Sequence, residues 1–166
     1  MPKPEPWLRG PLPGISPLVA NLFYSFAQVR EELAGALDGL SSDQIWRRPF
    51  GLAPLGFHVR HLGGAAERLG IYLQSGQLTP EQLQELQAES VPGASGAELL
   101  TQLDRRLREV EKVVAAIPPE TLEQRRAVGR AGLPSTAIGL IVHIAEHSQR
   151  HLGQAITMAK LVRSCP

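Results

Sequence analysis

Cysteine is nearly absent from this chain, which has 166 residues and a single cysteine, Cys165. An internal disulfide is therefore excluded, and so is a metal site built from several thiolates of this chain. Charge of one sign is also lacking, because 17 basic and 16 acidic residues leave a formal net charge of +1. Without a basic stripe, the sequence gives no electrostatic support for nucleic-acid binding.

Long apolar runs are missing as well. No stretch approaches the roughly 18 consecutive apolar residues of a membrane-spanning helix, and the first residues have no apolar signal-peptide core. Apolar residues make up 43% of the chain and charged residues 20%, which is typical of a globular protein. We therefore expect a cytoplasmic protein with no membrane partner.

Apolar residues that recur at every third or fourth position predict four long helices, over residues 18–40, 55–74, 96–117 and 134–162. The expected fold class is an all-α four-helix bundle. Thr79 followed by Pro80 is a good helix start, and it predicts a short extra helix over residues 80–88, between helices two and three. Residues 120–133 are expected to be a long connection.

Proline divides the chain into two unequal parts. Residues 1–17 contain six prolines, and a segment with so many prolines does not form a long helix. We expect residues 1–17 to form a Pro-rich N-terminal arm and residues 18–166 to form the bundle domain.

Histidine is the residue type with the most informative pattern. His58 and His61 lie on the second predicted helix, whereas His143, His147 and His151 follow one another at intervals of four on the last. Side chains four residues apart lie on one face of a helix, and two imidazoles so placed can bind one metal ion together with a ligand from another helix. His143 and His151 are roughly 12 Å apart along the axis, too far to share an ion. The pair is therefore either His143 with His147 or His147 with His151.

Two neighbouring patterns bear on this site. Gly63 and Gly64 directly follow His61, and they either let another helix approach closely or keep side chains clear of the site. Residues 143–147 also fit H-x-x-E-H, the pattern of inverted zinc proteases. No Asp or Glu follows His147 to supply the further ligand that such enzymes need, so a protease is disfavoured.

The two histidine segments together resemble the DinB-like superfamily, which includes the YfiT-type and mycothiol-dependent proteins. The resemblance is carried by residues 61–69, HLGGAAERL, and residues 143–154, HIAEHSQRHLGQ, and it extends over roughly residues 17–162. It implies a metal triad of His61, His147 and His151. It places His58, His143 and Gln154 around the bound ligand or water. The implied ion is divalent, namely zinc, nickel, manganese or iron.

The resemblance also implies a function. Some members of the superfamily use mycothiol, bacillithiol or a related low-molecular-weight thiol as S-transferases or isomerases, with the metal deprotonating the thiol. We expect such a transferase here, with no catalytic residue assigned; a hydrolase-like activity has less support. The alternatives are a non-catalytic, stress-associated protein stabilised by its metal, and a helical interaction module without metal. Apolar helix stripes on so short a chain also favour a homodimer.

Overall fold

The computed structural model describes residues 3–164, so Cys165 lies outside the described residues. Its helices are η1 (Pro6–Leu8), α1 (Ala20–Leu37), α2 (Ser42–Trp46), η2 (Pro49–Gly51), α3 (Leu55–Leu73), α4 (Pro80–Ala88), α5 (Gly96–Ala115), η3 (Pro119–Thr121) and α6 (Ala137–Ser164). Strands β1 (Arg125–Val128) and β2 (Leu133–Thr136) form a hairpin. Within residues 3–164 no helix is long and apolar enough to cross a membrane.

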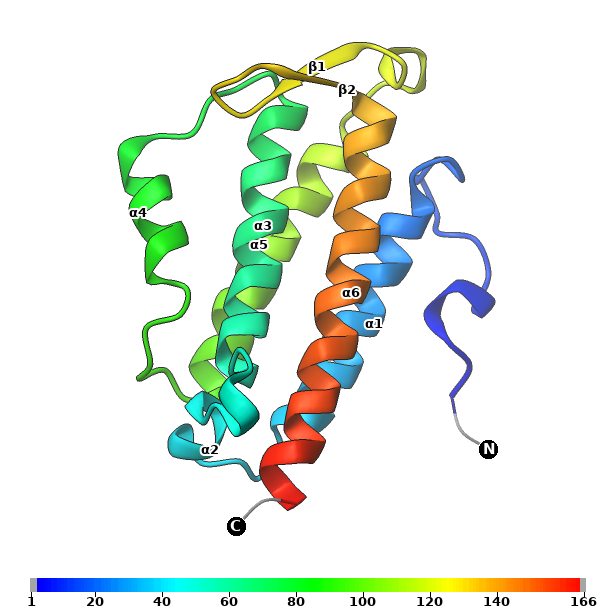
Figure 1. Ribbon diagram of the computed structural model, residues 1–166. Coiled ribbons are helices and arrows are strands. Elements are labelled where there is room, and N and C mark those ends of the chain that lie inside the picture. The colour runs from blue at the N-terminus through cyan, green and yellow to red at the C-terminus, as the bar shows by residue number, and fades with distance from the viewer. Residues whose placement is uncertain (1–2, 165–166) are drawn as a thin grey trace.

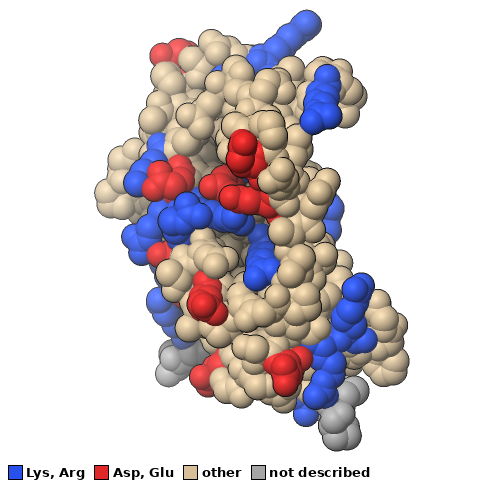
Figure 2. Space-filling model, turned by 90° about the vertical axis from the view of Figure 1, so that its left-hand side faces the viewer, with Lys and Arg blue, Asp and Glu red and all other residues tan. Residues whose placement is uncertain are grey.

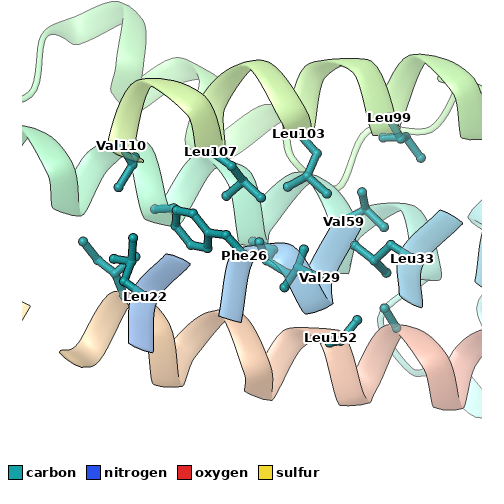
Figure 3. Packing of buried hydrophobic residues seen from close by; sticks show 14 of the residues in the cluster. Leu22, Phe26, Val29, Leu33, Val59, Leu99, Leu103, Leu107, Val110 and Leu152 are labelled. Atoms are coloured by element: carbon teal, nitrogen blue, oxygen red, sulfur yellow. The ribbon is translucent and has the colours of Figure 1, made fainter. Parts of the chain in front are cut away.

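Helices α1, α3, α5 and α6 form the expected all-α bundle (Figure 1). Each helix turns one apolar stripe inward. Figure 3 shows side chains from all four helices meeting, with Phe26 of α1 between Leu107 of α5 and the α6 side of the core. Phe26, Leu33 and Leu107 are completely buried. Burial of such stripes supplies most of the stability of helices in proteins.

Helix α4 stands outside the bundle on the side of α3 (Figure 1). It begins where the sequence predicts, because the Thr79 side chain accepts a hydrogen bond from the Gln82 backbone while the Gln82 side chain caps Thr79 in return. None of its residues is buried. Its contacts with the bundle include the ion pair of Glu85 with Arg106 of α5, at 2.8 Å.

The hairpin corrects two expectations. Residues 125–128 and 133–136 are antiparallel strands, with Arg125 paired to Thr136, where a connection and the start of the last helix were expected. Gly129 and Gly132 adopt positive φ angles of 69° and 63° and allow the tight turn between the strands. The Ala137 backbone then donates to the Gln124 carbonyl, so α6 begins at residue 137.

The Pro-rich segment lies against α1. Arg9 makes a bidentate contact with Glu31, at 2.6 and 2.7 Å, and Lys3 bonds the same carboxylate at 2.9 Å. The Tyr24 hydroxyl donates to the Gly10 carbonyl. The contacts with Arg9 and Lys3 lower the pKa of the Glu31 carboxyl to about 2. The division of the chain at residue 17 stays a prediction.

Candidate metal centre

Helices α3 and α6 run in opposite directions side by side (Figure 1). They bring three histidines together. His61 lies on α3, whereas His147 and His151 lie one turn apart on α6. One ring nitrogen of each lies within 4.8 Å of those of the other two. The ring centroid of His151 is 4.5 Å from that of His61 and 4.6 Å from that of His147. The geometry therefore favours the pair His147 and His151 over the pair His143 and His147.

The donor set fits a divalent ion. Nε2 of His61 lies 3.2 Å from Nε2 of His147, and two nitrogens bound tetrahedrally to zinc at about 2.0–2.1 Å lie about 3.3 Å apart. Neutral imidazoles are ligands for zinc, nickel and iron. Three protein ligands leave a coordination position open, as in catalytic rather than structural zinc sites.

Partial burial keeps the imidazoles of His147 and His151 neutral. It lowers the pKa of His147 to about 4, with further lowering by the charges of His61 and His143. Burial, followed by the neighbouring His61 and His147, lowers the pKa of His151 to about 3. At neutral pH both rings therefore present lone pairs, which is the form that binds a metal.

His58 lies on α3 one turn before His61, and its ring contacts that of His151. The Nδ1 atoms of the two rings are 3.1 Å apart, and His58 also hydrogen-bonds the backbone of Ala53. His58 is buried, and burial lowers its pKa. If His151 donates from Nδ1 to His58, its Nε2 is left free to face the other two ligands. This contact agrees with the expected role of His58 beside the triad, which itself stays a prediction.

A carboxylate that the sequence analysis did not single out supports His61. Oε2 of Glu89 lies 2.6 Å from Nδ1 of His61, and Oε1 lies 2.6 Å from the Arg68 guanidinium. Burial raises the pKa of Glu89, but the contacts with His61 and Arg68 outweigh it and hold the pKa below its ordinary value. An ionised carboxylate only accepts hydrogen bonds, so Nδ1 of His61 carries the hydrogen. In the neutral ring with this tautomer, Nε2 presents the lone pair that binds a metal.

The paired glycines have different roles, and that of Gly63 is the close helix approach which the sequence offered as one alternative. A Cβ atom at Gly64 would lie 2.2 Å from Oε1 of Glu89, so the glycine leaves room for that carboxylate. A Cβ atom at Gly63 would lie 3.1 Å from the Leu103 side chain, so this glycine lets α5 approach α3 closely.

The two other expected site residues lie at the edge. His143 is about half exposed and pairs with Glu146 at 3.3 Å, with its ring centroid 5.5 Å from that of His147. Gln154 is exposed and lines a pocket that His58 also lines. Phe57, which the sequence analysis passed over, stacks on His61 at 5.2 Å and covers one side of the cluster.

Two pockets flank the histidines along α3 and α6. The hairpin-side pocket, of about 410 Å³, is lined by Leu78, Leu83 and Leu86 near α4, by residues of α3 including Tyr72, by Arg130, and by His61 and His147. The η2-side pocket, of about 530 Å³, is lined by Leu52, Ala53, His58, Arg150, Gly153, Gln154, Thr157 and Met158. Both pockets open to solvent. His61 and His147 therefore border the hairpin-side pocket, whereas His58 is the histidine that borders the η2-side pocket.

The fold and the cluster define a helical-bundle protein in which helices α3 and α6 bring three histidines close enough to hold a metal ion. Residues 25–155 match the model of the DinB superfamily, and the chain belongs to that family. No curated protein matches the chain. The resemblance inferred from the two histidine segments is thereby confirmed.

Proposed function

We propose that this protein binds a divalent metal ion through His61, His147 and His151, and that it uses the ion to transfer a low-molecular-weight thiol to an electrophile. The observation that carries the proposal is the convergence of the imidazoles of His61, His147 and His151 beside an open pocket, which His61 and His147 line. When bound, a divalent ion lowers the pKa of a coordinated thiol and so supplies a thiolate at neutral pH.

The two pockets differ in their chemistry, which suggests how two substrates would be placed. The η2-side pocket offers Arg150, Gln154 and Thr157, whose donors suit the carboxylates and hydroxyls of a small thiol. Leucines and Tyr72 dominate the hairpin-side pocket, which suits the apolar body of an electrophile. In the transfer, the thiol gives up its proton to solvent and its sulfur forms a bond to the electrophilic carbon. The leaving group departs with the electrons of the broken bond.

Metal content is the first test. Tag-free protein is analysed by plasma mass spectrometry beside His147→Ala and the matched control His143→Ala, which removes an exposed histidine of the same helix. We expect about one ion per chain in the native protein and in the control, and loss of the ion in His147→Ala. Absence of metal from all three samples, with no binding on titration, would overturn the metal centre.

The second test separates an enzyme from a protein that is only stabilised by its metal. Cobalt-loaded protein is titrated with cysteine and with larger biological thiols, and a sulfur-to-cobalt absorption band is followed. Appearance of the band, and thiol consumption when an electrophile is added, supports S-transfer. If the metal stabilises the fold but no thiol perturbs the cobalt spectrum, the non-catalytic alternative holds.

A further inference from the structure

Glu89 is a buried charge at the end of a helix that has no buried residues of its own. It lies at the C-terminal end of α4, a helix without buried residues, yet only 3% of its own surface is exposed. Removing a carboxylate from water costs several kcal/mol unless it is paired and hydrogen-bonded. The partners of the buried Glu89 carboxylate therefore have to compensate for this cost.

Each oxygen of this carboxylate has one charged or polar partner. Oε2 contacts the ring nitrogen of His61, and Oε1 contacts the Arg68 guanidinium, both at 2.6 Å. Arg68 lies two turns after His61 on α3, so the carboxylate bridges two side chains of the same helix. Arg68 therefore fixes the position of the Glu89 carboxylate, and the carboxylate fixes the ring of His61.

The backbone around Glu89 is fixed independently of its side chain. Arg60 of α3 donates to the carbonyls of Ala88 and Val91, on either side of Glu89. Arg106 of α5 pairs with Glu85, one turn earlier on α4, at 2.8 Å. Figure 2, which faces the side where α4 lies, shows basic and acidic side chains next to each other across the middle of this surface. These contacts direct the Glu89 side chain over Gly64, which has no Cβ atom to block it.

We infer that Glu89 is a positioning residue for the metal ligand His61, because its carboxylate fixes the ring orientation and holds the hydrogen on Nδ1, so that Nε2 faces the ion. Carboxylates that bind the far nitrogen of a metal-bound histidine set the tautomer and raise the basicity of the ligand. This inference rests on the metal centre proposed above, and it is independent of the thiol chemistry. It also gives the α4 segment a function, since that segment brings the carboxylate to the site and contributes leucines to the hairpin-side pocket.

The test compares Glu89→Gln with Glu85→Gln. The first variant keeps the shape of the side chain but weakens the bond to His61, whereas the second loosens α4 without touching a histidine. Zinc affinity is measured by competition with a chromophoric chelator. We expect Glu89→Gln to lower the affinity about 10–100-fold, the range for such supporting groups, and Glu85→Gln to leave it within about twofold of the native value.

A second measurement detects the tautomer without metal. Long-range nitrogen–proton correlation spectra of the metal-free protein should show the His61 ring protonated on Nδ1, with a mixture of both tautomers in Glu89→Gln. Unchanged affinity and an unchanged tautomer in Glu89→Gln would overturn the inference. So would an equal loss of affinity in Glu85→Gln, because Glu89 would then act only as an anchor for α4. If native protein binds no zinc, the proposed metal centre falls, and this inference falls with it.

Discussion

Mild acid should destabilise the metal-free protein through its buried histidines. Burial first, and then neighbouring ring charges, lower the pKa of His147 to about 4 and that of His151 to about 3, whereas the same side chains in the unfolded chain titrate near 6.5. Between these values the unfolded chain holds more protons than the folded one. The stabilisation is therefore complete above about pH 6.5 and is lost as the pH falls towards the folded values.

The size of the effect follows from proton counting. Each extra proton on the unfolded chain makes the unfolding free energy change by about 1.4 kcal/mol per pH unit, so the two rings set an upper limit of about 2.7 kcal/mol per unit. Both rings are only partly buried, and solvent screening reduces that limit. We expect a loss of about 1–2 kcal/mol between about pH 6.5 and pH 5.

Urea unfolding in the presence of a chelator, followed by circular dichroism at several pH values, measures this slope. His147→Ala should reduce the slope, because one of the rings with a lowered pKa is gone, while His151 and His58 remain. Carboxyl groups with low pKa values, such as Glu31, titrate below this window and contribute little to it. A stability that stays flat or increases from pH 6.5 down to pH 5 would refute the argument that burial keeps these rings neutral.

Three further outcomes are expected. Zinc at about 100 times its dissociation constant should add about 2.7 kcal/mol to the free energy of unfolding. This gain raises Tm by roughly 5–10 °C in a chain of this size, and an unchanged Tm in a calorimetric scan would contradict the metal site. Gly64→Ala should lower zinc affinity and stability, because its Cβ would collide with Glu89. Gly35→Ala, in open space on α1, should instead raise the free energy of unfolding by about 0.4–1 kcal/mol. Equal effects of the two substitutions in urea titrations would contradict this. His58→Ala should weaken zinc binding about tenfold by releasing His151, and native affinity in a competition titration would exclude that support.

The bundle was predictable because its signals are local and repeated. Apolar residues at helical spacing predicted α1, α3, α5 and α6, and the capping residue Thr79 predicted where α4 begins. The hairpin was missed because its strands have only four residues each and are partly exposed, so no alternation of apolar residues marks them. Gly129 and Gly132 were the available signal. Pro134 resembled the first residue of a helix, but it pairs with Ala127 in the hairpin.

The site was predictable only as far as residue type and spacing reach. Three imidazoles on two helices are a pattern that the sequence displays, and the family resemblance selected among them. Glu89 is different, because it lies 28 residues from His61 and follows a surface helix. In the sequence it resembles any solvated glutamate. Only the packing of α4 against α3, over a glycine, makes it a partner of His61.

The distance along the chain between α3 and α6 gives the histidine cluster a role in folding. His61 and His147 are 86 residues apart in sequence, so an ion bound by both would act as a cross-link between the two halves of the chain. Such a cross-link can close only after α6 has docked on α3. Its energy therefore opposes unfolding more than it accelerates folding. The metal-bound protein would then unfold slowly and resist proteolysis of its opened state. Loss of the ion would make the chain easier to unfold and to degrade.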